Sequence, residues 1–152
     1  NLKRLPDHGL VFDICVKSHE LAVAEKLVAA APEVQFVLDH CGNPKVAAGE
    51  WESWQTQMAA IAALPNVVCK VSGILANVAS DWSVAQVRPY VEEVIRLFGW
   101  DRVVWGSDHP VVTLFGNLTS WVNASREIVA GASTDEQEKL FHRNAERVYR
   151  IG

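Results

Sequence analysis

The sequence predicts an α/β fold in which parallel strands alternate with helices, and three observations support this prediction. Four short apolar runs are rich in β-branched residues and have the length of strands. Apolar residues between these runs recur with the spacing of amphipathic helices. The runs are also almost continuously apolar, which is typical of parallel strands that are buried on both faces. The predicted strands lie within residues 9–16, 34–40, 66–73 and 101–108.

Four of the five predicted helices have a recognisable start or stop in the sequence. Pro32, Pro65 and Gly99 each end an apolar stripe with helical spacing. The last helix begins at residues 133–136, a capping sequence whose side chains satisfy the free N–H groups of a first helical turn. The predicted helices span residues 21–31, 51–62, 84–98, 121–129 and 133–149.

Repeated strand–helix units predict a parallel sheet with right-handed crossovers. Two architectures are compatible with this pattern: an open doubly wound sheet and part of a (β/α)8 barrel. The sequence contains neither Gly-x-Gly-x-x-Gly nor Gly-x-x-x-x-Gly-Lys-Ser/Thr, the phosphate-binding loops that are common in open sheets.

Composition and charge narrow the class of protein. A chain of 152 residues with 49% hydrophobic and 21% charged residues is expected to form one folded domain over residues 1–152. The net charge of -4 and the lack of a basic stripe argue against nucleic acid and anionic membranes as partners. The chain begins with Asn1 rather than Met, so we expect it to be processed, truncated or a fragment.

The sequence also predicts a cytoplasmic location. No apolar run approaches the roughly 18–20 residues that cross a bilayer, and no signal peptide is present. Three cysteines are too few for a disulfide scaffold, and their spacing is not that of a zinc site. We therefore expect the cysteines to be small buried residues.

Polar side chains gather where the predicted strands end. Ligands bind at the carboxyl ends of parallel strands, because loops from neighbouring strands converge there. The opposite ends carry only turn residues such as Pro32, Pro65 and Asp101, and this asymmetry predicts a functional site. The polar residues after the four strands include Lys17 and His19, then Asp39, His40 and Cys41, then Lys70 and Ser72, and finally Ser107, Asp108 and His109.

Two of these residues are candidates for catalysis. His40 is a candidate metal ligand, electrophile or general base, since imidazole titrates near neutral pH. The alternative is a loop histidine that only makes hydrogen bonds. Asp108 is a candidate general base or metal ligand, and the alternative is a turn residue ahead of Pro110.

Lys70 and His109 are candidates for substrate binding. Lys70 is placed to meet a substrate carboxylate, with an ion pair to a nearby aspartate as the alternative, and a turn role is the alternative for His109. We expect Asp39 to be structural, because successive strand side chains alternate and Asp39 should point away from His40.

Four segments, in order along the chain, resemble segments of the amidohydrolase-related (amidohydrolase 2) family in its lactonase branch. That branch includes fuconolactonase, rhamnonolactonase and pyrone-dicarboxylate lactonase. Residues 36–44 resemble its Asp-His-x-Gly-x-Pro segment, and residues 67–73 resemble its Asn-Val-x-x-Lys-x-Ser-Gly strand. Residues 102–110 are similar to its Gly-Ser-Asp-Trp-Pro segment, with His109 where Trp is common. Residues 144–150 resemble its Asn-Ala-x-x-x-Tyr ending.

The resemblance implies a fold: the C-terminal half of a distorted (β/α)8 TIM barrel. The four strands would be similar to the family's fifth through eighth strands. His40 and Asp108 would then be the functional residues of the sixth and eighth strands. The His-x-His pair of the family's first strand has no counterpart here, and a full member would be about twice as long.

The resemblance also implies a reaction. Asp108 is expected to activate a water molecule that attacks a lactone carbonyl, and His40 is expected to polarise that carbonyl. His40 and Asp108 are also the expected ligands of one divalent metal such as zinc, with a metal-independent reaction as the alternative. His109 and Lys70 are expected to bind the substrate, a small lactone or carboxylate.

The predicted function is therefore hydrolysis of a sugar lactone or a similar cyclic ester, and two alternatives stay open. One is a decarboxylase of the same superfamily, which uses a comparable metal site. The other is a non-catalytic half-barrel, because open strand edges and an exposed inner face invite association. Such a half-barrel would need an oligomer or a complementary N-terminal half-barrel as its partner.

Overall fold

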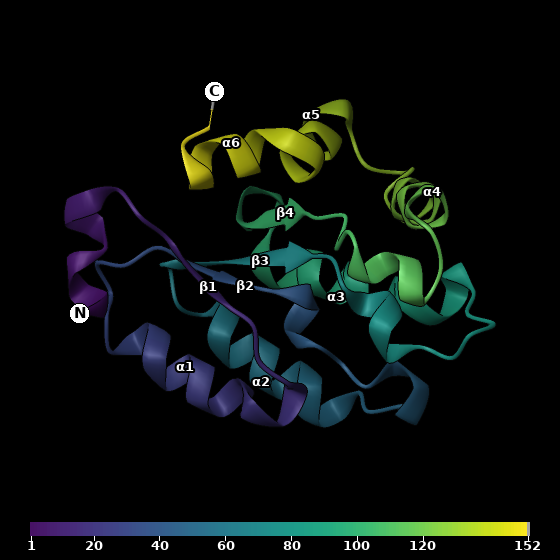
Figure 1. The fold of residues 1–152 in the computed structure, drawn as a ribbon, viewed down its shortest axis with the longest axis horizontal. Helices are drawn as coiled ribbons and strands as arrows, with labels where there is room; N and C mark the ends of the chain where they lie inside the picture. The colour runs from purple at the N-terminus through teal and green to yellow at the C-terminus, as the bar shows by residue number, and fades with distance from the viewer. Residues whose placement is uncertain (152) are drawn as a thin grey trace.

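The computed structural model describes residues 1–151, which contain a four-stranded parallel sheet (Figure 1). Its strands follow the chain in the order β1-β2-β3-β4, with no strand inserted between sequence neighbours. A doubly wound sheet reverses its strand order at a switch point, whereas a barrel keeps sequential order, so this order is that of part of a barrel. The strands are β1 (Phe12–Ile14), β2 (Phe36–Leu38), β3 (Val67–Val71) and β4 (Val103–Trp105).

Helices follow each strand, as predicted, and Figure 1 shows α1 and α2 on one side of the sheet and α5 and α6 beyond β4. The helix after β4 begins three residues earlier than expected, because the Asn117 side chain accepts the Ser120 N–H and caps it. None of the helices in residues 1–151 is both long and apolar enough to cross a membrane. The helices are α1 (Leu21–Ala29), α2 (Glu52–Ala62), α3 (Val84–Phe98), α4 (Leu118–Ile128), α5 (Thr134–Glu138) and α6 (Asn144–Tyr149).

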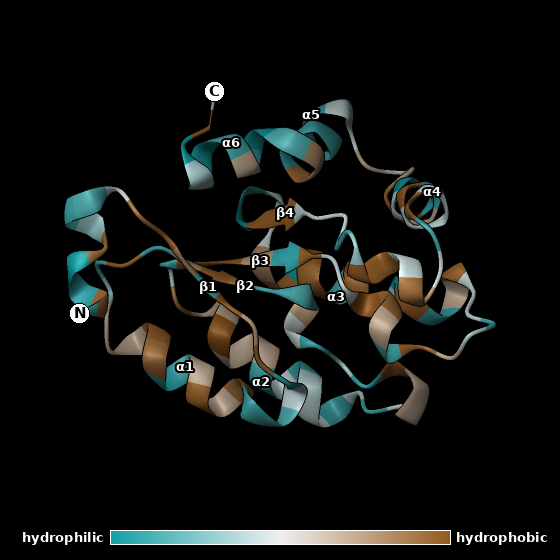
Figure 2. Ribbon diagram, viewed as in Figure 1, coloured by the Kyte–Doolittle hydropathy of each residue, from teal (hydrophilic) through white to brown (hydrophobic). Residues whose placement is uncertain are grey.

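The main hydrophobic core lies between one face of the sheet and the helices. Strand side chains at alternate positions enter this core, among them Phe36 and Leu38 of β2 and Cys69 and Val71 of β3. In Figure 2 the strands are mostly brown, whereas helices α1 to α3 mix brown and teal along their length. Each of these helices therefore buries an apolar stripe against the sheet and exposes a polar one.

The other face of the sheet carries a smaller apolar cluster and is covered in part by α6. Val37, Val68 and Val104 lie on this inner face and pack against Val148 of α6. The strand register pairs Val37 with Val68 and places Lys70 beside Val104. The inner face is thus apolar where it meets α6 and charged one position further along the strands.

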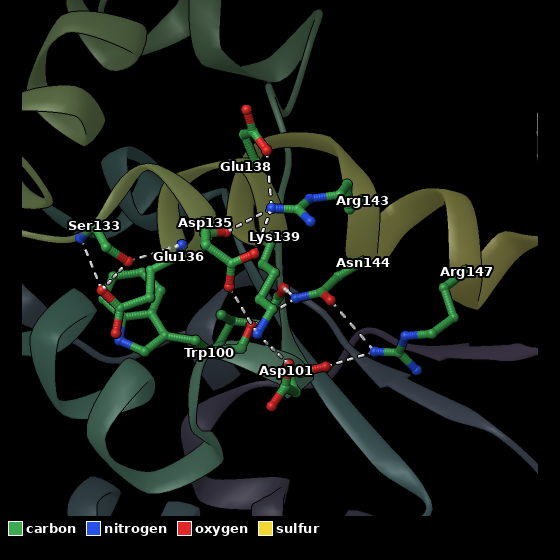
Figure 3. A network of polar contacts seen from close by, with 11 residues as sticks. Trp100, Asp101, Ser133, Asp135, Glu136, Glu138, Lys139, Arg143, Asn144 and Arg147 are labelled. Carbon is green, nitrogen blue, oxygen red and sulfur yellow. Dashed lines mark hydrogen bonds and ion pairs between the residues drawn. The ribbon is translucent and has the colours of Figure 1, made fainter.

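A polar network attaches the C-terminal helical segment to the amino end of β4 (Figure 3). The buried Asn144 amide donates hydrogen bonds to the carbonyl oxygens of Trp100, at 2.7 Å, and Val103, at 2.8 Å. The Lys139 ammonium pairs with Asp101 at 2.9 Å. The segment predicted as one helix over residues 133–149 is divided by a wider helical turn at Lys139–Arg143, which packs on β4.

We predict that Asn144→Ala lowers the free energy of unfolding by about 2–3 kcal/mol, because two buried carbonyl groups lose their donor. Urea unfolding followed by circular dichroism measures this loss. Asn123→Ala is the matched control, since Asn123 is exposed on α4 and makes no side-chain hydrogen bond within residues 1–151. Equal losses in the two variants would show that Asn144 does not anchor the helix.

Candidate active site

The loops after β2 and β4 bring His40 and Asp108 together. The His40 Nε2 atom lies 3.9 Å from the Asp108 Oδ1 atom, and both side chains are mostly buried, with 22% and 14% of their surfaces exposed. Both residues have positive φ values, 59° for His40 and 56° for Asp108. Such backbone conformations are costly for residues other than glycine and cluster at functional sites. The two residues that the sequence singled out for catalysis therefore face each other at the carboxyl ends of the strands.

The loop after β3 fixes the orientation of the His40 ring. The His40 Nδ1 atom shares a 2.9 Å hydrogen bond with the buried hydroxyl of Ser72. Gly73, with a φ of +60°, lies directly against the imidazole, and a Cβ atom at this position would be 2.8 Å from the His40 Cβ and still closer to the ring. Glycine is needed at position 73 for both its conformation and its lack of a side chain. The ring is therefore held so that Nε2 faces Asp108.

The prediction that Asp39 points away from His40 is wrong. A carboxylate oxygen of Asp39, a ring nitrogen of His40 and the Cys15 Sγ atom all lie within 4.8 Å of one another. Strand β2 ends at Leu38, and the positive φ of His40 turns the chain, so the alternation of strand side chains does not extend to these residues.

The cysteine prediction needs one correction. Cys41 and Cys69 are buried as expected, but Cys15 is exposed because β1 has no further strand beside it within residues 1–151. Burial raises the pKa of the Cys41 thiol to about 12. Partial burial, together with the negative charges of Asp39 and Asp108, also raises the pKa of Cys15. The Cys15 thiol therefore stays protonated near neutral pH and is no activated nucleophile.

Lys70 lies on the inner face of the sheet between two carboxylates. Its Nζ atom is 2.6 Å from Asp13 Oδ2 on β1 and 2.7 Å from Asp39 Oδ1 after β2. Burial lowers the pKa of Lys70, but hydrogen bonds to these two carboxylates outweigh it and raise the pKa overall. Of the two interpretations of Lys70, the structure shows the ion pair with nearby aspartates.

Tyr149 completes this inner-face network from α6. Its hydroxyl donates a 2.8 Å hydrogen bond to Asp13 Oδ2, and its ring lies 5.4 Å from the Lys70 ammonium. Burial raises the pKa of Tyr149 to about 12, so the hydroxyl remains a donor at physiological pH. Sequence analysis missed both Asp13 and Tyr149 as site residues. The one available signal was a charged Asp13 in the middle of an apolar strand.

The electrostatic surroundings make Asp108 a stronger base than an ordinary carboxylate. Burial raises its pKa, the nearby His40 lowers it, and the negative charge of Asp39 raises it, with a net upward shift. Lys70 is engaged with Asp13 and Asp39, and the nearest histidine or cationic side chain to Asp108 within residues 1–151 is His40. A carboxylate with a raised pKa is suited to accept a proton.

His109 lies beside Asp108 on the exposed rim of the site. Its backbone N–H donates a 3.2 Å hydrogen bond to Ser107 Oγ, which closes a tight turn. His109 is exposed, and its role in substrate binding stays a prediction.

The donor atoms fit part of a metal site. Two ligand atoms of a tetrahedral zinc ion lie about 3.4 Å apart, and His40 Nε2 and Asp108 Oδ1 lie 3.9 Å apart, so a small side-chain shift would let both bind one ion. Asp39 belongs to the nearby donor cluster, but its Oδ1 atom contacts the Lys70 ammonium, which opposes a second cation there. Since a catalytic zinc usually has three protein ligands, His40 and Asp108 supply part of such a set.

This arrangement defines a class of protein: an α/β half-barrel with a histidine–aspartate site at the carboxyl ends of its strands. Comparison with known proteins agrees with this class. A sequence model of the amidohydrolase family matches residues 1–151, and the chain belongs to this family.

Two curated relatives match nearly the whole chain. An uncharacterized protein of Sinorhizobium fredii, y4mH, is 36% identical over 150 residues, covering 98% of this chain and 50% of the relative. An L-fucono-1,5-lactonase of Burkholderia ambifaria is 34% identical over 148 residues, covering 95% of this chain and 51% of the relative. The chain thus spans about half the length of the curated relatives it matches.

A solved structure confirms the fold. An amidohydrolase from Burkholderia multivorans, crystallised with bound zinc, superposes with a TM-score of 0.95 at 24% identity and covers 99% of this chain and 56% of its own. The chain therefore has the fold of half of an amidohydrolase (β/α)8 barrel, as the sequence predicted.

We predict that Gly73→Ala displaces the His40 ring and destabilises the fold by about 2–3 kcal/mol, because an added Cβ meets both a left-handed backbone and the imidazole. Gly49→Ala is the matched control: its φ is +65°, but nothing lies within 4 Å of the added Cβ, so it should cost only about 1 kcal/mol. Urea unfolding and the ¹⁵N resonances of the His40 imidazole report the two effects. Unchanged imidazole resonances in Gly73→Ala would contradict this role of the glycine.

We predict that Lys70→Met destabilises the protein by about 3 kcal/mol at neutral pH, because two inner-face carboxylates lose their cation. Folding raises the Lys70 pKa above its ordinary value of 10.5, so its contribution is complete below that pH and declines as pH rises beyond it. The difference in stability between the variant and the unaltered protein should therefore begin to shrink only above about pH 10.5 and continue to shrink as pH rises further. Lys26→Met, at an exposed position on α1, is the control and should change stability by less than about 0.5 kcal/mol.

Proposed function

We propose that this chain forms part of a hydrolase that opens a sugar lactone or a similar cyclic ester. The observation that carries the proposal is the 3.9 Å approach of His40 and Asp108 at the carboxyl ends of parallel strands. The relative named L-fucono-1,5-lactonase, at 34% identity, supports a lactone as the substrate class. The narrower proposal is that the cyclic ester is a sugar lactone.

In this proposal Asp108 acts as the general base. Its carboxylate takes a proton from a water molecule whose oxygen attacks the lactone carbonyl carbon, and the ring C–O bond of the tetrahedral intermediate then breaks. The protonated Asp108 returns the proton to the departing ring oxygen, which leaves a hydroxy acid. The upward-shifted pKa of Asp108 supports the first step, because a more basic carboxylate accepts a proton more readily.

His40 polarises the carbonyl. The Ser72 hydroxyl can donate to His40 Nδ1, which leaves a hydrogen on Nε2 directed toward the space beside Asp108. A hydrogen bond from Nε2 to the carbonyl oxygen stabilises the negative charge that develops during attack. In the other tautomer His40 Nε2 carries no hydrogen, and Nε2 and Asp108 would then hold a divalent metal such as zinc, which would supply Lewis-acid polarisation of the same carbonyl.

Two further residues are proposed to bind the substrate. His109 lies on the rim beside Asp108 and is exposed to an entering ligand. Lys70 is the second proposed substrate-binding residue, and a carboxylate group of the ligand would compete with Asp13 and Asp39 for its ammonium. Its ion pairs with Asp13 and Asp39 hold the ammonium in place.

The activity of the whole protein is proposed to need more chain than residues 1–151. The sheet is open at β1 and β4, and each edge strand presents backbone groups that another strand can pair with. A complementary half-barrel, or an oligomer, is the proposed source of the missing strands and of further ligands for the site.

We predict that, in the complete enzyme, Asp108→Asn lowers the turnover of an aldono-1,5-lactone at least about a hundredfold, because an amide cannot accept the proton of water. Continuous titration of the released acid at constant pH measures the rate. Asp81→Asn, at an exposed position before α3, is the matched control and should keep full activity.

The same titration separates the alternatives. Turnover in Asp108→Asn within a few-fold of the unaltered protein would refute the role of Asp108. Release of carbon dioxide from a carboxylated substrate, without net acid from any lactone, would replace hydrolysis by the decarboxylase alternative.

A further inference from the structure

A cavity of about 430 Å³ lies beside the His40–Asp108 pair, at the same end of the sheet. Its walls come from the loops after β1, β2 and β3, so three separate segments build it. None of the reaction steps proposed for His40 and Asp108 involves this cavity. The polar residues that line it include Cys15, Lys17 and Glu20 after β1, Asn43 and Lys45 after β2, and Asn77 after β3.

We propose that this cavity binds the hydroxyl-bearing part of the lactone substrate and that Asn77 and Lys17 determine selectivity for a polyhydroxylated ring. This inference rests on the proposed function, since it assigns the part of the substrate that does not react. It names a subsite and two specificity-determining residues.

Cys15 connects the cavity with the reacting groups. Its side chain lines the cavity, and its Sγ atom lies within 4.8 Å of a ring nitrogen of His40. A ligand that fills the cavity therefore ends next to His40, where the carbonyl of the same molecule would be attacked.

Asn77 is held in place and keeps an acceptor available. Its amide group donates a 3.2 Å hydrogen bond to Asn43 Oδ1, and the Asn43 amide donates in turn to the Val16 carbonyl at 2.7 Å. Within residues 1–151 the Asn77 Oδ1 atom accepts no protein hydrogen bond, although the residue is partly buried and lines the cavity. A substrate hydroxyl can satisfy this acceptor.

The charges of the cavity favour neutral hydroxyl groups over a second carboxylate. Lys17 and Glu20 both line it, and Lys45 is paired with Glu50 at 3.5 Å, so cations and anions are balanced. A hydroxyl group both donates and accepts hydrogen bonds, and it therefore matches a wall that offers an ammonium, a carboxylate and an amide. A carboxylate would be attracted by Lys17, but it only accepts hydrogen bonds and so cannot satisfy the Glu20 and Asn77 oxygens.

Two lactams that are not hydrolysed test the subsite by binding alone. One probe is a polyhydroxylated aldono-1,5-lactam, and the other is δ-valerolactam, which has the same ring and amide but no hydroxyl groups. Titration of the ¹⁵N-labelled chain, followed by NMR, measures both dissociation constants. We expect the hydroxylated lactam to bind at least about tenfold more tightly, since each well-placed hydrogen bond contributes roughly this factor.

Two variants with matched controls locate the effect. Asn77→Ala and Lys17→Met are each expected to lower the preference for the hydroxylated lactam about fivefold or more, while δ-valerolactam binding stays within twofold. Asn123→Ala and Lys26→Met replace exposed residues of the same types outside the cavity and should leave the preference unchanged. If Asn77→Ala unfolds because the contact with Asn43 is lost, Lys17→Met still tests the subsite.

The outcomes separate this inference from the proposed function. Equal binding of the two lactams, no binding of either, or a preference that survives both cavity variants overturns the subsite. Selective lactam binding by the chain, together with a complete enzyme that releases no acid from any lactone, supports the subsite and contradicts hydrolysis. Acid release without lactam selectivity supports hydrolysis and overturns the subsite.

Discussion

The ion pairs of Lys70 on the inner face of the sheet are the interaction on which the rest of the site depends. One ammonium, within 2.7 Å of carboxylates from β1 and from the end of β2, connects three strands of a parallel sheet. Asp13 on β1 is in register with Val37 on β2, which is in register with Val68 on β3, so the long Lys70 side chain on the same face reaches across β2 to Asp13. The Lys70 ammonium also offsets the negative charges of Asp13 and Asp39 in the surroundings of the His40–Asp108 pair.

The His40–Asp108 pair combines an unfavourable backbone with well-supported side chains. Positive φ values at both residues are costly, and they persist because surrounding contacts determine the conformation. The Ser72 hydroxyl and the absence of a side chain at Gly73 fix the imidazole, while burial and Asp39 shift the Asp108 pKa upward. Rigid strands thus place two reactive groups that come from loops 68 residues apart in the sequence, between positions 40 and 108.

Much of the fold and part of the site could be predicted from the sequence, for identifiable reasons. Continuous apolar runs such as residues 66–73 mark strands because a strand that is buried on both faces has few polar side chains. The polar side chains that it does have contact other charged groups. His40 and Asp108 were identifiable because each follows such a run. Tyr149 was not, because its contact with Asp13 joins residues at the two ends of the chain, and no local pattern records that approach. Asp39 was misplaced because strand alternation was extended two residues past the end of β2.

The sequence by itself determined the alternation of strands and helices, the parallel sheet and the end of the sheet at which chemistry gathers, since hydrophobic periodicity and turn residues are local properties. Only the tertiary structure decided the partners of each polar group: Lys70 with two aspartates, His40 with Ser72, and Asn77 with Asn43 at the wall of a cavity. These pairings depend on strand order, register and backbone conformation at the loop residues. The pattern of residues along the chain does not give the distances between loops. These distances arise when three crossovers bring the ends of successive strands to one edge of the sheet.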